Sequence, residues 1–119
     1  MINLRYVLHF SSCGYFCLKH IEKKGNFKRK GYMSLYEMKE QLVKHNYYCM
    51  CVRVKGFDGI KGKCVTLLNL KNSFHFVVIE KVEDDFIYFY DPLFLFVRKV
   101  KKSKFYKKWS KICLFYKKI

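Results

Sequence analysis

Residues 75–79 read His-Phe-Val-Val-Ile, an apolar run that opens with an imidazole. The acidic residues 83–85 separate this stretch from a second apolar run at 86–90, and Asp91 follows directly. Two apolar runs around a short polar turn predict a β-hairpin. This hairpin is expected to hold His75 at the start of its first strand and Asp91 at the end of its second.

The hydrophobic period changes from that of helices to that of strands near Tyr47. Before that point, Ser34-Leu-Tyr-Glu37 is a capping box, in which each of the two end side chains accepts from the backbone N–H of the other. The pattern predicts helices over 13–24 and 35–45, strands over 47–54, 64–70, 75–82, 86–90, 95–100 and 112–116, a helical turn within 56–62, and a short helix from Ser103 through Trp109. Two helices followed by a mostly antiparallel sheet predict an α+β fold, with the helices packed on one side of the sheet.

Apolar side chains recur at helical spacing in both N-terminal helices and are expected to face the core. They are Phe16, Cys17, His20 and Ile21 in the first helix, and Leu35, Met38, Leu42 and Val43 in the second. Gly25 is expected to end the first helix.

The chain is strongly basic, with 25 Lys and Arg against 9 Asp and Glu and a formal charge of +16. This balance favours an acidic partner: a nucleic acid, an anionic membrane face or an acidic peptide. A compositional bias that spreads lysines over a solvated surface explains the same numbers. With 119 residues, 51% of them hydrophobic, the chain is expected to form one folded domain over residues 1–119.

The six cysteines at 13, 17, 49, 51, 64 and 113 match no zinc-binding spacing, so no metal site is expected. A disulfide framework is one alternative. Reduced thiols in a cytosolic setting are favoured, because the apolar content suffices for a core.

No run approaches the roughly 18 apolar residues of a membrane span. A lipid-modified Cys13 is a further alternative, although His9 interrupts the apolar stretch before it.

Cys13, His75 and Asp91 form the candidate catalytic set. Ser11 or Ser12 is expected to cap the helix that begins at Cys13, so the thiol faces unpaired N–H groups and the positive end of the helix dipole. Both favour the reactive thiolate, and the same N–H groups can bind an oxyanion. An imidazole that takes the thiol proton and a carboxylate that orients it complete a cysteine-nucleophile site. Each residue alone has a simpler structural explanation, but their joint order favours catalysis.

Five segments stand in an order that is typical of one known family. They are Ser12-Cys13-Gly14 with the helix after it, Ser34–Asn46, His75-Phe-Val-Val-Ile79, Asp91-Pro92 and Phe105-x-x-x-Trp109. In these segments, which cover nearly the whole chain, the sequence resembles the peptidase domain at the N-terminus of bacteriocin-exporting ABC transporters. That family consists of papain-like cysteine peptidases that cut leader peptides after a double glycine.

The resemblance implies a papain-like fold with Cys13 as nucleophile, His75 as general base and then acid, and Asp91 as the orienting residue. It implies a cytoplasmic location at the inner face of the cell membrane, beside the membrane and ATPase domains of an exporter. The implied partner is a leader peptide, and no cofactor is required. Tyr32 and Tyr36 are candidates to line the leader groove, while the lysines can steer acidic leader residues or contact an anionic membrane surface.

Two positions depart from the family pattern. Val7 stands where the family carries a glutamine whose amide completes the oxyanion hole, and losing one such donor costs on the order of a hundred- to a thousandfold in rate. The Cys13 backbone N–H remains as a donor, and His9 or Arg5 is a candidate substitute for the glutamine. Leu93-Phe-Leu95 follows Asp91-Pro92 where the family has a glycine.

Two other functions stay open from the sequence. Val7 favours a catalytically weakened domain that binds a leader or docks to an exporter without cutting. The charge and the many aromatic residues favour a nucleic-acid-binding module. However, the chain carries no nucleic-acid motif, so no specific nucleic-acid partner is expected.

Overall fold

The computed structural model describes residues 12–29, 31–71 and 73–119. Its helices are α2 (Cys13–Ile21), α3 (Leu35–Lys44) and α4 (Lys102–Tyr106), with one 3-10 turn, η1 (Phe57–Gly59). Its strands are β1 (Tyr47–Arg53), β2 (Cys64–Leu70), β3 (Ser73–Val82), β4 (Phe86–Asp91), β5 (Phe96–Lys101) and β6 (Trp109–Lys118). The predicted order, two helices followed by a sheet with one late helix, is confirmed.

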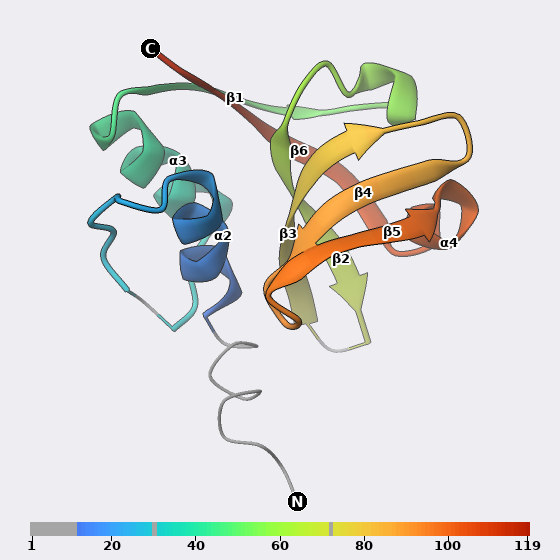
Figure 1. Cartoon of the computed structure of the whole chain (residues 1–119), viewed down its shortest axis with the longest axis horizontal. Coiled ribbons are helices and arrows are strands. Elements are labelled where there is room, and N and C mark those ends of the chain that lie inside the picture. Colours follow the sequence, from blue (N-terminus) through green and yellow to red (C-terminus); the bar gives the residue numbers. More distant parts are fainter. Residues whose placement is uncertain (1–11, 30, 72) are drawn as a thin grey trace, which may run out of the picture.

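The six strands form one antiparallel sheet in the order β1-β6-β2-β3-β4-β5 (Figure 1). The last strand, β6, lies between β1 and β2, so the C-terminal segment is an interior part of the sheet. The predicted hairpin is present as β3 and β4, with Val78 opposite Tyr90. Because β3 is itself an interior strand, all side chains from His75 to Ile79 are buried.

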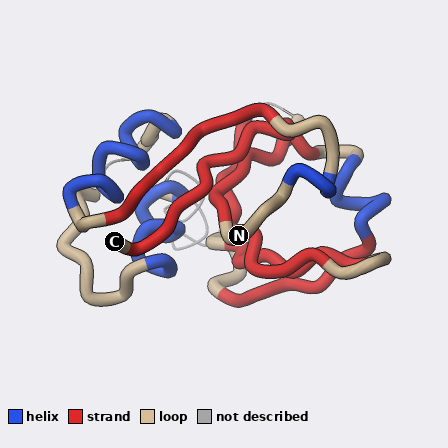
Figure 2. The backbone as a smooth tube through the Cα atoms, turned by 90° about the horizontal axis from the view of Figure 1, so that it is seen from above, coloured by secondary structure: helices blue, strands red, loops and turns tan. Residues whose placement is uncertain are grey.

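The sheet buries side chains on both of its faces. One core lies against α2 and α3 and includes Cys17, Leu18, Met38, Leu42, Val65, Val78 and Leu114. A second core lies against α4 and includes Ile79, Ile87, Phe89, Phe105, Trp109 and Cys113. Figure 2 shows the strands between the α2–α3 pair and the two short helical segments. The prediction that the helices pack on one side of the sheet therefore holds for α2 and α3 and is wrong for α4.

The capping box of α3 is confirmed. Ser34 Oγ accepts from the Glu37 N–H at 3.1 Å, and the Ser34 N–H donates to Glu37 Oε1 at 3.2 Å. Met38 and Leu42 are fully buried as predicted, whereas Val43 is 52% exposed. Val43 lies about 100° around the helix from Leu42, which places it outside the narrow stripe that the sheet covers.

Helix α2 ends at Ile21, earlier than the predicted Lys24. Glu22 is extended, and its carboxylate accepts from the Tyr47 hydroxyl at 3.1 Å and from Lys118 at 3.0 Å. These contacts with β1 and β6 hold the chain away from the helical path, and a local pattern does not reveal them. The buried face of α2 also differs from prediction, since Leu18 is fully buried and Phe16 only half-buried.

The late helix is shorter than predicted, because Trp109 begins β6 instead of ending α4, and Lys101, not Ser103, is the N-cap residue. The Trp109 indole donates to Thr66 Oγ1 at 2.9 Å and stacks on Phe57 with ring centroids 4.7 Å apart. These contacts fix the indole in the second core. From there β6 extends beyond the predicted 112–116, because it pairs along the whole of β1.

Candidate active site

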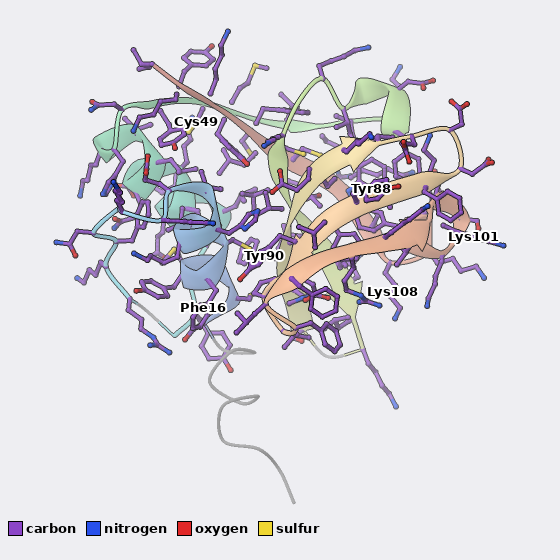
Figure 3. The ribbon with its side chains drawn as sticks, viewed as in Figure 1. Phe16, Cys49, Tyr88, Tyr90, Lys101 and Lys108 are labelled. Atoms are coloured by element: carbon purple, nitrogen blue, oxygen red, sulfur yellow. The ribbon has the colours of Figure 1, made fainter. Side chains whose placement is uncertain are left out.

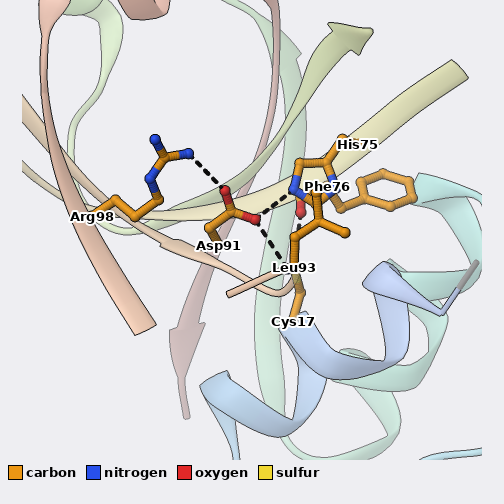
Figure 4. A network of polar contacts seen from close by, with 6 residues as sticks. All are labelled: Cys17, His75, Phe76, Asp91, Leu93 and Arg98. Atoms are coloured by element: carbon orange, nitrogen blue, oxygen red, sulfur yellow. Dashed lines mark hydrogen bonds and ion pairs between the residues drawn. The ribbon is translucent and has the colours of Figure 1, made fainter. Parts of the chain in front are cut away.

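The β3–β4 hairpin brings His75 and Asp91 together, as the sequence predicts. His75 Nε2 donates to Asp91 Oδ1 at 2.7 Å, and each residue is only 3% exposed (Figure 4). The Leu93 N–H donates to the same oxygen at 3.0 Å. Two donors on one oxygen fix the plane of the carboxylate, which in turn fixes the orientation of the imidazole.

The second carboxylate oxygen of Asp91 accepts a hydrogen bond from Arg98. Nη1 of Arg98 lies 3.1 Å from Asp91 Oδ2, and Figure 4 shows the guanidinium on the opposite side of the carboxylate from His75. The guanidinium carbon lies 5.0 Å from the centre of the Phe94 ring and 5.7 Å from that of Phe89. Pairing with a carboxylate and contact with aromatic faces are typical of arginine in partly buried sites.

The charges of this network shift two pKa values in opposite directions. Burial lowers the pKa of His75, but the hydrogen bond to Asp91 and the Cys13 side chain outweigh burial and raise it to about 9. Burial raises the pKa of Asp91, but His75, Arg98 and the Leu93 N–H outweigh burial and lower it. At neutral pH the pair is therefore an imidazolium and a carboxylate.

Cys13 is the first residue of α2, the helix that packs on β3 and β4. Its thiol is buried and close enough to His75 to contribute to the raised pKa of the imidazole. Among the described residues, Nδ1 of His75 makes no regular hydrogen bond. Nε2 of the ring is therefore bonded to Asp91, whereas Nδ1 is not held by a regular hydrogen bond within the described residues.

Cys17, one turn further along α2, is in a different environment. Its S–H donates to the Phe76 carbonyl at 3.5 Å, and the side chain is fully buried. Burial and then the nearby Cys13 and Asp91 raise its pKa well above the ordinary value. A neutral, buried thiol of this kind is inert, so Cys17 is a core residue.

An open groove of about 430 Å³ begins at Cys13. Its walls come from the segment before α3 and from β2 and β3, and they include Tyr32, Met33, Leu67, Phe74 and Phe76. Tyr32 is 79% and Phe74 65% exposed at its rim. Tyr32 therefore lines a groove that Cys13 also borders, whereas Tyr36 is not among the residues that line it, and the contact of either tyrosine with a leader stays a prediction. A separate hollow of about 510 Å³ lies against β1 and β6 and borders none of the three candidate catalytic residues.

A second histidine–carboxylate pair supports the end of β4. His20 of α2 bonds through Nε2 to Glu80 Oε1, and Lys63 pairs with the other oxygen of Glu80 at 3.3 Å. The His20 ring stacks on Tyr90, with centroids 3.9 Å apart and planes 7° apart. Figure 3 shows Tyr90 between β4 and α2. Because Tyr90 directly precedes Asp91, this stack holds the end of β4 against α2, the helix that carries Cys13.

The structure bonds His75 to Asp91 and places the Cys13 side chain close enough to act on the same ring, and Tyr32 lines the groove that borders Cys13. The candidate oxyanion residues Arg5, Val7 and His9 lie outside the described residues. No group of three or more metal-ligating side chains occurs within residues 12–29, 31–71 and 73–119. Arg98 is a site residue that the sequence pattern did not reveal, because its only local signal is an arginine in a lysine-rich exposed strand.

The fold has clear counterparts among solved structures. The peptidase domain of Streptococcus ComA, described as a bi-functional ABC transporter involved in a quorum sensing pathway, superposes with a TM-score of 0.76 over 100% of this chain and 96% of that chain, at 14% identity. The peptidase domain of Streptococcus mutans ComA gives 0.72 over 98% and 95%, at 15% identity. A double glycine motif protease from an AMS/PCAT transporter, solved with a leader peptide, gives 0.68 over 91% and 85%, at 17% identity.

Comparison with curated protein sequences gives no match. None of the helices in the described part of the chain is long and apolar enough to cross a membrane. The sequence profile of the Peptidase C39 family matches residues 15–119, a span that contains His75 and Asp91 and begins just after Cys13. Because this match covers most of the sequence, the chain belongs to the Peptidase C39 family.

Proposed function

We propose that this chain cuts a leader peptide after a double glycine, with Cys13 as nucleophile, His75 as proton carrier and Asp91 as orienting residue. The observation that carries the proposal is the arrangement of His75. One ring nitrogen is bonded to Asp91 Oδ1 at 2.7 Å, and the Cys13 side chain acts on the same buried ring. This is the arrangement that a cysteine peptidase needs before substrate binds.

In the proposed reaction, His75 takes the proton of the Cys13 thiol, so the attacking group is a thiolate. The thiolate attacks the carbonyl carbon of the second glycine and forms a tetrahedral oxyanion. The C–N bond then breaks, His75 gives its proton to the leaving amine, and a thioester to Cys13 remains. Water attacks the thioester, His75 takes a proton from that water, and the thiolate leaves.

The oxyanion is proposed to bind at the N-terminus of α2. The Cys13 N–H is in the first turn, where backbone N–H groups have no partner within the helix. The helix dipole adds a partial positive charge at this end. Val7 supplies no side-chain donor, so His9 stays a candidate for the second one. The rate is expected to fall below that of an enzyme with a complete oxyanion hole.

The groove beside Cys13 is proposed to bind the leader. Its walls are apolar and its rim carries the exposed rings of Tyr32 and Phe74, which suits the apolar face of an amphipathic peptide. Glycines at the cleavage point need no side-chain pocket, so they can pass close to the buried sulfur. Tyr36 is 70% exposed but lies outside this lining, and we propose no contact for it with the residues nearest the scissile bond.

The partners proposed for the domain are the membrane and ATPase domains of an ABC transporter that exports the cleaved peptide. The domain would then work on the cytoplasmic side of the membrane, where the formal charge of +16 favours contact with anionic lipid headgroups. The peptidase domains of ComA and of the AMS/PCAT transporter support this assignment, because they share the fold along nearly the whole chain.

The test is a digest of a double-glycine leader peptide, followed by mass spectrometry. The wild-type protein is expected to release two fragments that meet after the second glycine, and the Cys13→Ala protein none. The Val7→Gln variant is expected to be faster, because it supplies the side-chain donor that the family carries at this position. If the wild-type protein binds the leader and releases no fragment, the chain is a docking domain and the catalytic proposal is wrong.

A further inference from the structure

A second, smaller hollow lies at the imidazole and is separate from the groove beside Cys13. It encloses about 200 Å³ and borders His75 and Asp91, but Cys13 does not line it. The larger groove of about 430 Å³ shows the reverse arrangement, since it borders Cys13 and not His75. The larger groove therefore borders the nucleophilic sulfur, and the smaller hollow borders the imidazole and its carboxylate.

The chemistry of peptide cleavage assigns the two halves of a substrate to these two hollows. The acyl half becomes bonded to the Cys13 sulfur, so it must lie on the sulfur side. The amine half leaves with a proton from His75, so it must pass beside the imidazole. We propose that the smaller hollow binds the residues that follow the scissile bond and selects an acidic side chain among them. This assignment rests on the proposed function, because it presumes cleavage at Cys13.

The charge of the smaller hollow supports an acidic occupant. Among the described residues that line it, Arg98, Lys104 and Lys108 are basic and Asp91 alone is acidic. The oxygens of Asp91 already accept from His75, from the Leu93 N–H and from Arg98. In the described part of the chain, neither Lys104 nor Lys108 forms an ion pair. Two lysine ammonium groups are thus available to a carboxylate that enters the hollow.

The walls of the hollow increase the effect of these charges. Leu68, Phe89, Val100 and Phe105 give it apolar sides, and Phe94 is 51% exposed at its mouth. Apolar walls exclude water and lower the local dielectric, which strengthens attraction between a bound carboxylate and the lysines. Lys108 lines the hollow together with Arg98 and Val100 of β5, and Lys101 is the last residue of that strand (Figure 3). Lys101 and Lys107 do not line the hollow, although they lie near in sequence to the lysines that do.

The experiment uses two peptides with the same double-glycine leader. One continues as Ala-Asp-Ala-Glu-Leu and the other as Ala-Lys-Ala-Lys-Leu. The wild-type protein is expected to cleave the acidic peptide with a kcat/KM about fivefold higher, mainly through a lower KM, as expected for two partly screened ion pairs. The Lys104→Met/Lys108→Met protein is expected to lose this preference. The matched Lys101→Met/Lys107→Met protein removes the same charge outside the hollow and is expected to keep it.

The results show whether the preference for the acidic peptide comes from the hollow or from the net charge of the protein. Equal cleavage of the two peptides by the wild-type protein, or an equal loss of preference in both double variants, overturns the inference while the proposed function stands. If no peptide is cleaved, the proposed function fails, and the hollow is then tested by calorimetry with the free pentapeptides and the Cys13→Ser protein. If the Cys13→Ser protein binds the acidic pentapeptide and the Cys13→Ser/Lys104→Met/Lys108→Met protein does not, the hollow is supported as the acidic site. If the triple variant still binds this pentapeptide, the inference is overturned.

Discussion

Arg98 of β5 donates to Asp91 Oδ2 at 3.1 Å and leaves the other carboxylate oxygen to His75. The strand register explains how it reaches Asp91, since Arg98 lies opposite Phe89 on β4, near the end of the strand that carries Asp91. Burial favours the protonated form of a carboxylate, and each cation beside it favours the ionised form, so Arg98 adds to the effect of His75. Arg98 is therefore expected to be a positioning residue that acts through Asp91.

Replacing Arg98 by Met is expected to change the pH dependence of cleavage. Without the guanidinium, the pKa of Asp91 rises from its lowered value, so the carboxylate becomes protonated at a higher pH. The acid limb of the kcat/KM profile is expected to move up by about one pH unit. Arg98→Lys is expected to restore part of the shift. A Met variant whose activity falls by the same factor at every pH would contradict a role through Asp91.

The stability of the fold is expected to depend on the His75–Asp91 pair at both pH extremes. The pKa of His75 is raised to about 9, so its contribution is complete below the ordinary value of about 6.5 and is lost as the pH rises through about 9. The pKa of Asp91 is lowered, so its contribution is complete above about 3.9 and is lost on acidification through the lowered value. Denaturant titrations across the alkaline range measure the first of these losses. A His75→Gln protein serves as control and should show a flatter curve there; parallel curves would refute the linkage.

The two thiols of α2 are expected to separate catalysis from stability. Cys13→Ala removes the nucleophile and is expected to abolish cleavage while the protein stays folded. Cys17→Ala leaves a small cavity and removes the hydrogen bond from the thiol to the Phe76 carbonyl, at a cost of about 1–2 kcal/mol in the free energy of unfolding. Cleavage by the Cys17→Ala protein is expected to persist at a temperature where it is folded. Denaturant titration and the leader digest on both variants test this pair, and loss of cleavage in a folded Cys17→Ala protein would contradict it.

Leu95 occupies a backbone conformation that glycine adopts more easily. Its φ is 58° in the turn between β4 and β5, where the side chain is 36% exposed. Left-handed backbone costs a leucine roughly 1–2 kcal/mol, and glycine relieves this at some cost in unfolded-chain entropy. Leu95→Gly is therefore expected to raise the free energy of unfolding by up to about 1 kcal/mol. Val97→Gly, on the neighbouring strand, is the control and is expected to lower it. A destabilised Leu95→Gly protein would show that the leucine side chain contributes more than its backbone costs.

The sequence predicted the elements whose signals are local. The capping box at Ser34 and Glu37 satisfies its own backbone groups, so the start of α3 needs no distant partner. The strand Cys64–Leu70 and the β3–β4 hairpin follow from continuous apolar runs with a polar turn between them. The hairpin also predicted the contact between His75 and Asp91, because it places the start of β3 beside the end of β4.

Tertiary structure decided what depends on partners far along the chain. Trp109 begins a strand because Thr66 and Phe57 receive its indole, and α2 stops at Ile21 because Glu22 bonds to Tyr47 and Lys118. Arg98 joins the site only because β5 pairs with β4 in one register, and Val43 is exposed only because the sheet covers a narrow face of α3. Periodicity and capping are properties of neighbouring residues, whereas these outcomes are set by side chains that meet only after the sheet has formed.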